Sequence, residues 1–382
     1  MARWGRVGEW VVAAACAMHI GCSSSNEVSG AGGSGGGAGA DGSSGGSGIV
    51  ACDHVVSSDN DLVLGFGVAL ATDGTDVFVL KDKEMRRTVQ VLRSGNLVDV
   101  VGVDNDPTNV YPGGASLVVT ANGFFFDATS GGKRSIYRSS RAGDAGDAPE
   151  RLVDLGDASG STKPPFVADD TYIYMQAPAP AGDSLAQLSQ QAPANSTGTI
   201  VSSGVFLDAS FSSMAVTADA VFNATSGGGM VSLRASSKSL PMSTPPPAKL
   251  GVFALPLCEG STVSLQPGSE AIFLGCNAND GQQTIYQVPL PSDWPPNGNP
   301  GQGAIIVSGI PINAQVFLVQ GTVVYYFNES VPGLFRISGN DGGTPDAGGG
   351  TKIMASHGAK HMAADAQNIY VLSACGLQQA PL

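Results

Sequence analysis

Six polar residues, each shortly ahead of a predicted strand, have the types and spacing that could do chemistry together. They are Asp61, Asn109, Asp208, Glu259, Asn313 and His361. If a fold brought them to one rim, their oxygen atoms could bind Ca²⁺, which takes six to eight oxygen ligands. Only three of the six are carboxylates, and their offsets from the strands are uneven. We therefore expect ordinary polar loop residues and no metal or other cofactor, and we keep a Ca²⁺ site as the alternative.

The sequence offers no motif that places a nucleophile or a catalytic metal. Neither H-E-x-x-H nor a Walker sequence occurs, and no His or Asp is placed to activate one of the many serines. His357 and His361 have the i, i+4 spacing of a helical metal pair, but the surrounding pattern predicts strand, loop and strand. With His54 they could lie near one seam as structural loop residues. We assign no catalytic residue and favour a protein that is not an enzyme.

The composition describes an acidic, loop-rich chain. Its 382 residues include 53 Gly, and only 13% are charged. No apolar stripe at helical spacing persists for three turns, which disfavours a helical enzyme. The formal net charge of -13 would repel phosphate, so we expect no nucleic-acid partner.

The elements that carry these residues recur about every 49 residues. Each copy predicts a short apolar strand, a turn and a second strand with a shared aromatic residue. The seven aromatic residues are Phe78, Phe125, Tyr174, Phe222, Phe273, Tyr325 and Tyr370, spaced 45 to 52 positions apart. The turns carry acids that we expect to hold the backbone rather than to catalyse, because Asx side chains stabilise such turns. These acids are Asp73, Asp170, Asp219 and Asp365.

Two further strands follow in each copy, so one copy predicts a four-stranded antiparallel sheet without a helix. Such a sheet cannot bury both of its faces alone, so the copies must pack on one another. Seven sheets around an axis give a closed solution. The predicted fold is therefore all-β, a seven-bladed β-propeller over residues 49–382, with a β-sandwich or a solenoid as alternatives.

This pattern resembles the seven-bladed β-propellers of the YWTD, NHL and TolB-like kind. The signature tetrapeptides and dipeptides of the named families are absent, so no family ligand is carried over to this chain. The resemblance implies a ligand face formed by the loops that join strands two to three and four to one. In propeller hydrolases and lactonases an oxygen-rich rim on this face holds Ca²⁺, which makes a hydrolase or lyase the alternative function.

The seventh copy ends after three strands, and the run "GIVACDHVV" after residue 48 can supply the fourth. Cys52 lies in that run and Cys375 at the adjacent turn, so we predict a disulfide between them. Closing a loop of more than 300 residues could add about 4 to 5 kcal/mol in the chain-entropy model. Cys258 and Cys276 flank the first two strands of the fifth copy and form the second predicted pair. Four free thiols remain the alternative.

The first residues have the layout of an export signal. Arg3 and Arg6 precede an apolar run that is too short to span a membrane. The following "HIGCSSS" resembles a bacterial lipobox, although His19 stands where Leu is usual, and it implies lipid attachment at Cys22. Cleavage after Ala17 is the alternative. Residues 23–48 contain eleven Gly and eight Ser, the composition of a flexible linker.

Together these features predict a signal peptide over residues 1–21, a lipidated Cys22 with a linker to residue 48, and one propeller domain over residues 49–382. Ser23 after the lipidated Cys implies sorting to the outer membrane in Gram-negative cells. We expect a monomeric lipoprotein that is anchored to the bacterial cell envelope and acts as a binding or protein-interaction module. Its protein or small-molecule ligand is not predicted.

Overall fold

The computed structural model describes residues 52–58, 62, 67–105, 116–140, 148–157, 166–177, 184–203, 212–227, 230–238, 248–254, 263–268, 270–277, 283–290, 304–310, 312–328, 331–338 and 350–382. All of them belong to the second of two compact units, Ile49–Leu382. The predicted signal peptide, Cys22 and the linker lie outside the described residues. Where the chain is described, no helix is long and apolar enough to cross a membrane.

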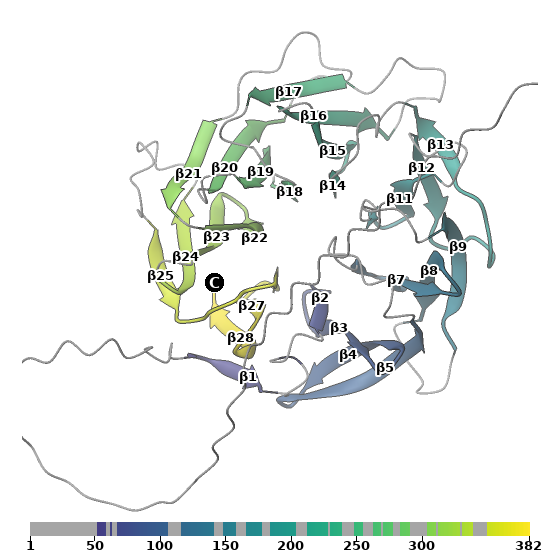
Figure 1. Ribbon diagram of the computed structural model, residues 1–382, viewed down its shortest axis with the longest axis horizontal. Coiled ribbons are helices and arrows are strands. Elements are labelled where there is room, and N and C mark those ends of the chain that lie inside the picture. The colour runs from purple at the N-terminus through teal and green to yellow at the C-terminus, as the bar shows by residue number, and fades with distance from the viewer. Residues whose placement is uncertain are drawn as a thin grey trace, which may run out of the picture. The chain divides into compact units, whose positions relative to one another are not determined.

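The strands form seven four-stranded antiparallel sheets around a ring (Figure 1). Blade 1 contains β2 (Gly67–Thr72), β3 (Val77–Lys83), β4 (Arg86–Arg93) and β5 (Asn96–Asp104). Blade 2 contains β6 (Leu117–Thr120), β7 (Gly123–Ser130), β8 (Lys133–Ser139) and β9 (Glu150–Asp157). Blade 3 contains β10 (Val167–Ala168), β11 (Tyr172–Gln176), β12 (Leu185–Ser189) and β13 (Thr199–Ser202). Blade 4 contains β14 (Ser212–Val216), β15 (Ala220–Gly227), β16 (Met230–Ser237) and β17 (Ala248–Ala254).

The remaining three blades continue the same order. Blade 5 contains β18 (Val263–Pro267), β19 (Ala271–Asn277), β20 (Gln283–Pro289) and β21 (Ala304–Ile310). Blade 6 contains β22 (Ile312–Gln320), β23 (Val323–Asn328), β24 (Gly333–Ser338) and β25 (Thr351–Met354). Blade 7 contains β26 (His361–Ala364), β27 (Asn368–Ser373), β28 (Gly376–Pro381) and, as its fourth strand, β1 (Val55–Ser57). The seven-bladed propeller is confirmed, and the sandwich and solenoid alternatives are excluded.

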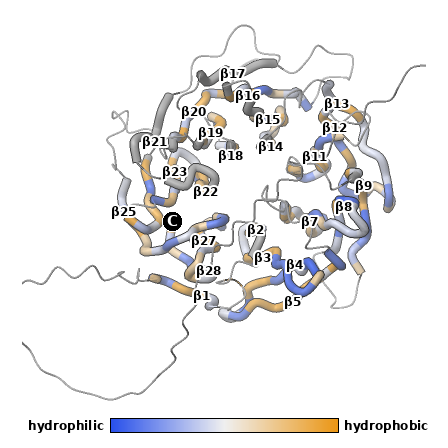
Figure 2. Tube along the Cα trace, in the orientation of Figure 1, coloured by the Kyte–Doolittle hydropathy of each residue, from blue (hydrophilic) through white to orange (hydrophobic). Residues whose placement is uncertain are grey.

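Apolar side chains fill the seams between neighbouring blades, and the strands that are coloured in Figure 2 carry apolar stretches. Among the described residues, the buried apolar side chains form seven clusters. Each of the seven repeated aromatic residues lies in a different one of these clusters and is at most 6% exposed. At the seam of blades 1 and 2, for example, the ring of Phe78 meets that of Phe124 edge-on, 4.8 Å between centroids. The repeat spacing therefore places one aromatic anchor in each seam, where aromatic side chains bury large apolar areas.

The turns between first and second strands use acidic side chains as expected, but in blade 3 the acid is one residue earlier than predicted. In three blades the Oδ1 atom of the first turn residue accepts two backbone N–H groups. These residues are Asp73, Asp169 and Asp365. Asp170 is instead exposed, and in blade 4 the turn is held by the Thr217 hydroxyl rather than by Asp219. The acid must be the first residue of the four-residue turn, because only from there can its side chain accept the backbone N–H groups of the third and fourth turn residues.

The ring closes where the N-terminal strand β1 pairs antiparallel with β28, as predicted. The local path differs from the prediction, because Cys52 precedes β1 instead of lying in it. If β1 were extended straight toward the N-terminus, Cys52 would lie near the C-terminal end of β28, whereas Cys375 lies before its N-terminal end. His54 has a φ of 55°, and this left-handed residue turns the chain so that Cys52 lies beside Cys375.

The structure contains the disulfide Cys52–Cys375, with 5.8 Å between the two Cα atoms and 323 residues of sequence separation. Cys258 lies outside the described residues, so the pair Cys258–Cys276 stays a prediction. Cys276 is fully buried in β19, opposite Val263 of β18. The covalent closure of the ring thus rests on a bond that joins its two ends.

Replacing Cys52 and Cys375 together by Ala is expected to lower the free energy of unfolding by about 2 to 5 kcal/mol, because the unfolded chain is then no longer constrained by the long loop. Urea unfolding of the variant and of the oxidised parent measures the difference. Treatment of the parent with a thiol reductant also breaks the disulfide and is expected to lower the urea midpoint in the same way. Equal urea midpoints for the oxidised parent and the double variant would contradict a stabilising bond.

Candidate binding face and seam of the ring

Strand order divides the loops of the propeller between two faces. Turns from strand one to two and connections from strand three to four emerge on one face, and all other connections emerge on the opposite face. We call the first the crown face, after its long three-to-four connections. They are residues 140–149, 190–198, 238–247, 290–303 and 339–350. We call the second the clasp face, because it carries the disulfide Cys52–Cys375.

The predicted polar rim belongs to the clasp face. Asp61, Asn109, Asp208 and Glu259 lie outside the described residues, so their convergence stays a prediction. Asn313 lies near the start of β22, where the pairing with β23 is irregular. His361 is the first residue of β26 and pairs in register with Leu372.

On the crown face, a polar cavity of 480 Å³ opens between blades 2 and 3. Its lining includes Asn122, Arg138, Glu150, Gln190 and Gln191. Arg138 at the end of β8 forms an ion pair with Glu150 at the start of β9. The same guanidinium donates to the backbone carbonyl of Gln190 at 2.6 Å. This volume is in the range of small-molecule pockets, and its polar lining suits a polar ligand.

Gln190 bridges the two blades beneath this cavity, and it is 1% exposed. Its Oε1 accepts hydrogen bonds from the Thr120 hydroxyl and from the Asn122 amide, both at 2.9 Å. Its amide nitrogen donates to the carbonyl of Asp169. The side chain therefore ties the turn of blade 2 to the turn of blade 3, and it fixes the floor of the cavity.

Next along the crown face, Lys238 ties blade 4 to blade 3 at the base of the proline-rich connection 238–247. Its Nζ lies 2.5 Å from Oδ2 of Asp169 and 5.8 Å from the ring centroid of Tyr174. The Tyr174 hydroxyl donates to the same carboxylate at 2.9 Å. Burial alone would raise the pKa of Asp169, but the bonds from Lys238, two backbone N–H groups and Tyr174 lower the pKa to about 2. Burial and the neighbouring carboxylate raise the pKa of Tyr174.

A second group of charges is buried at the clasp-face end of blades 1 and 2. Asp127 of β7 accepts from Nε of Arg134 at 2.7 Å and from the Ser116 backbone N–H at 2.8 Å. Arg87 of β4 lies 3.4 Å from the same carboxylate and forms a second ion pair with Asp82 at 2.7 Å. Burial acts to raise the pKa of Asp127, but Arg134 and Arg87 outweigh it and the pKa is lowered. Each charge has an opposite partner, as burial in low dielectric requires.

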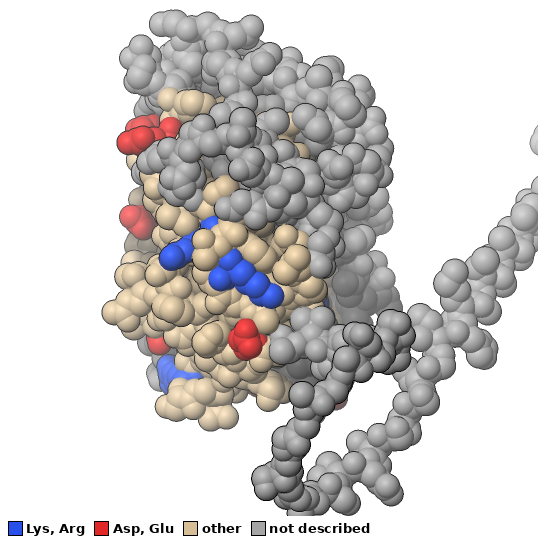
Figure 3. Space-filling model, turned by 90° about the vertical axis from the view of Figure 1, so that its left-hand side faces the viewer, with Lys and Arg blue, Asp and Glu red and all other residues tan. Residues whose placement is uncertain are grey.

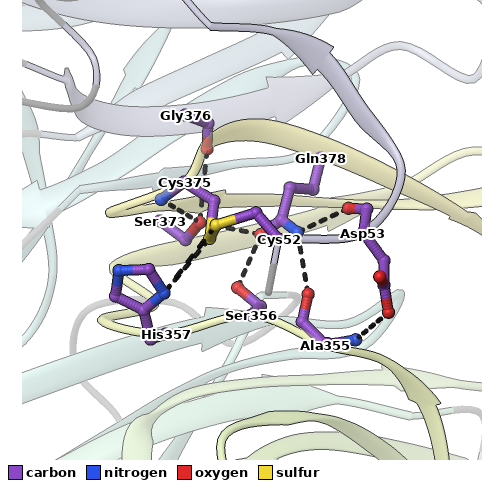
Figure 4. Close-up of a disulfide and its surroundings, with 9 residues drawn as sticks. All are labelled: Cys52, Asp53, Ala355, Ser356, His357, Ser373, Cys375, Gly376 and Gln378. Carbon is purple, nitrogen blue, oxygen red and sulfur yellow. Dashed lines mark hydrogen bonds between the residues drawn. A yellow bond between two sulfur atoms is a disulfide. The ribbon is translucent and has the colours of Figure 1, made fainter. Parts of the chain in front are cut away.

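At the seam of the ring, the fully buried amide of Gln378 connects three segments (Figure 4). Its Nε2 donates to the carbonyls of Asp53 at 2.6 Å and Ala355 at 3.0 Å. Its Oε1 accepts from the hydroxyls of Ser356 at 2.6 Å and Ser373 at 2.8 Å. One side chain thereby joins the N-terminal segment, the blade 6 to 7 connection and the turn before β28.

His357 is the one histidine of the three weighed from the sequence whose ring lies beside the disulfide. Its Nδ1 is 3.3 Å from Sγ of Cys375 and 3.8 Å from Sγ of Cys52. The "HGAKH" spacing gave no sign of this, because the contact depends on the connection 355–360 and not on a helix. Sequence reasoning also missed Gln190 and Gln378, whose only signal was a polar residue beside buried strand positions.

Two ion pairs are described on the crown face, Arg138 with Glu150 and Lys238 with Asp169. On the side of the ring shown in Figure 3, a few described Lys, Arg, Asp and Glu side chains lie among uncharged described residues.

Asp169→Asn is expected to lower the free energy of unfolding by about 1 kcal/mol at neutral pH, because a charge-assisted contact is lost at a partly exposed site. The folded pKa of Asp169 lies below the ordinary carboxyl value of 3.8. The contribution is therefore present above about pH 4 and is lost as the pH falls toward 2. Urea midpoints of the parent and the variant should converge over this interval. The exposed neighbour Asp170→Asn is the matched control, and a gap that stays constant down to pH 2.5 would contradict the assignment.

Comparisons with known proteins assign no family to this chain. No protein-family model and no curated protein matches the sequence. The WD40 domain of Toxoplasma gondii coronin is similar with a TM-score of 0.49 and 11% identity, over 86% of this chain and 83% of that chain. BamB from Moraxella catarrhalis has a TM-score of 0.47 and 11% identity, over 82% and 84%. The PQQ-bound aldose sugar dehydrogenase from Streptomyces coelicolor has a TM-score of 0.43 and 13% identity, over 80% and 96%.

Proposed function

We propose that this chain is a lipid-anchored protein of the bacterial cell envelope whose propeller binds a partner through the crown face. Export, acylation of Cys22 and sorting to the outer membrane are part of the proposal and rest on the sequence of the N-terminal segment. The propeller serves as a binding module, and its partner is a protein or a small polar molecule.

The observation that carries the binding role is the pair of polar cavities on the crown face. Five of the seven blades also have three-to-four connections of nine residues or more on this face. The same face holds the 480 Å³ cavity and a second polar cavity of 580 Å³ on blade 3, lined in part by Tyr172, Gln187 and Asn195. Binding residues are commonly carried by loops that a rigid scaffold positions.

The chain enters the described part of the propeller on the clasp face. Cys52, the first described residue, lies there beside Cys375. A pull on the linker would act on the disulfide before it acted on the three residues of β1.

For the anchor, the mature N-terminus is expected to be a triacylated Cys22, and Cys22→Ser is expected to move the protein from the membrane fraction to the soluble fraction. Three acyl chains hold a protein to a bilayer stably, whereas an unacylated chain has no such attachment. Mass spectrometry of the N-terminal peptide measures both the cleavage site and the lipid. A mature peptide that begins at Met18 without lipid would refute the anchor.

For the crown face, Gln191→Trp is expected to weaken partner binding roughly tenfold, the effect of losing about 1.4 kcal/mol of contact. Gln191 is exposed at the mouth of the cavity, so the indole blocks access without removing a buried contact. Cross-linking in intact cells measures the yield of the bound partner. Arg86→Trp, exposed on the clasp face, is the matched control. An equal loss for both variants, or a loss for Arg86→Trp alone, would count against the crown face.

A binding module without a structural metal is expected to keep its thermal transition in EDTA, and to keep it when Asp208 and Glu259 are replaced together by Ala. Both residues belong to the predicted rim on the clasp face. A rim that held Ca²⁺ would lose the stabilisation that a bound ligand gives to the folded state. Differential scanning calorimetry with and without EDTA measures the change. A lower transition temperature in either experiment would favour the hydrolase or lyase alternative.

A further inference from the structure

We propose that the clasp face carries a metal site which the disulfide masks: after reduction of the Cys52–Cys375 bond, the two cysteine sulfurs and Nδ1 of His357 bind one Zn²⁺. The three side chains come from different parts of the chain, namely the segment before β1, the connection 355–360 and the turn before β28. Their ligand atoms lie within 4.8 Å of one another. Figure 4 shows the imidazole turned toward both sulfurs. The fold thus brings together two sulfur ligands and one imidazole ligand that no local sequence motif predicts.

The distances match the edges of a zinc tetrahedron. Nδ1 of His357 is 3.3 Å from one sulfur and 3.8 Å from the other. In a tetrahedral site with Zn–S of about 2.3 Å and Zn–N of about 2.0 to 2.1 Å, that edge is about 3.6 Å. The two sulfurs must move apart after reduction, because their own edge in a tetrahedral site is roughly 3.8 Å. Small rotations about the Cα–Cβ bonds can supply this movement without a shift of the strands.

The surrounding hydrogen bonds hold the ligands in place whether or not the disulfide is intact. The carbonyl of His357 accepts from the Ala374 N–H at 3.0 Å. The N–H of Cys375 donates to the Ser373 hydroxyl at 3.0 Å, and that hydroxyl is bound to the buried Gln378. The N–H of Asp53, next to Cys52, donates to the carbonyl of Ala355 at 3.2 Å. Each ligand residue, or its direct neighbour, is therefore fixed by bonds that reduction does not break.

The donor set favours zinc over harder cations. Thiolate and imidazole are preferred by Zn²⁺, whereas Ca²⁺ and Mg²⁺ take oxygen. The carboxylate of Asp53 accepts the Ala355 N–H at 3.0 Å. This bond points the carboxylate away from the sulfurs, so Asp53 does not serve as a fourth ligand. Three protein ligands leave one position for water.

The chemistry balances as two separate steps. A dithiol or phosphine reductant transfers two electrons to the disulfide, the S–S bond breaks, and two protons are taken up to give two thiols. Zn²⁺ then displaces those two protons, forms two Zn–S bonds, and accepts the lone pair of His357 Nδ1. The metal and the disulfide exclude each other, because both use the same sulfur electrons.

The test uses the full chain, reduced with a phosphine and then exposed to Zn²⁺ alone. Alkylation of each cysteine by iodoacetamide, followed by peptide mapping, measures protection at individual thiols. Zinc is expected to slow alkylation of Cys52 and Cys375 at least tenfold and to raise the transition temperature of the reduced chain. His357→Asn should weaken the zinc affinity at least tenfold. His54→Asn is the matched control, because His54 has a positive φ that Asn tolerates.

Several outcomes would overturn the site. The site is wrong if zinc protects neither thiol, if it protects them equally in the His357→Asn variant, or if the oxidised chain takes up as much zinc as the reduced one. Replacement of Cys52 and Cys375 together by Ser should abolish the rise in transition temperature. If that rise persists in the double variant, the zinc is bound by other residues, and the proposal fails.

Discussion

The pairing of β1 with β28 is the contact on which the ring depends. Every other blade receives its fourth strand directly from its own third strand, but blade 7 takes it from the beginning of the chain. A four-stranded blade buries its two faces only against its neighbours. If β1 left blade 7, the apolar cluster that Leu62, Val79 and Leu372 share across the seam of blades 7 and 1 would lose part of its cover.

The periodic features of the fold could be predicted from the sequence because they repeat. One aromatic residue recurs in every copy, and each seam needs one such anchor. The features set by contacts between distant segments could not be predicted. Gln190 and Gln378 are polar residues on strands or strand ends, and nothing local shows that their partners come from another blade. The turn at His54 is a single left-handed residue, which a pattern of alternating side chains does not reveal.

The two faces of the propeller carry different kinds of interaction. On the crown face, polar contacts lie between turns of neighbouring blades, as at Gln190 and Lys238, and a polar cavity opens beside them. On the clasp face, the contacts are buried and closed, as at Asp127 and Gln378. The predicted rim residues could bind a ligand or a metal ion on the clasp face only if their side chains converge.

Backbone pairing between β1 and β28 is not enough to close the ring, because the two strands come from opposite ends of the propeller sequence. Bringing the ends of a chain segment of 323 residues together costs about 5 kcal/mol of loop-closure entropy in a flexible chain. β1 offers three residues to offset that cost, and its register with β28 is irregular. The disulfide removes much of the cost by restricting the unfolded chain, and Gln378 adds four hydrogen bonds, one of which holds the N-terminal segment at Asp53. The bond therefore acts mainly on the unfolded state and the amide acts on the folded state, so losing one should leave the other effective.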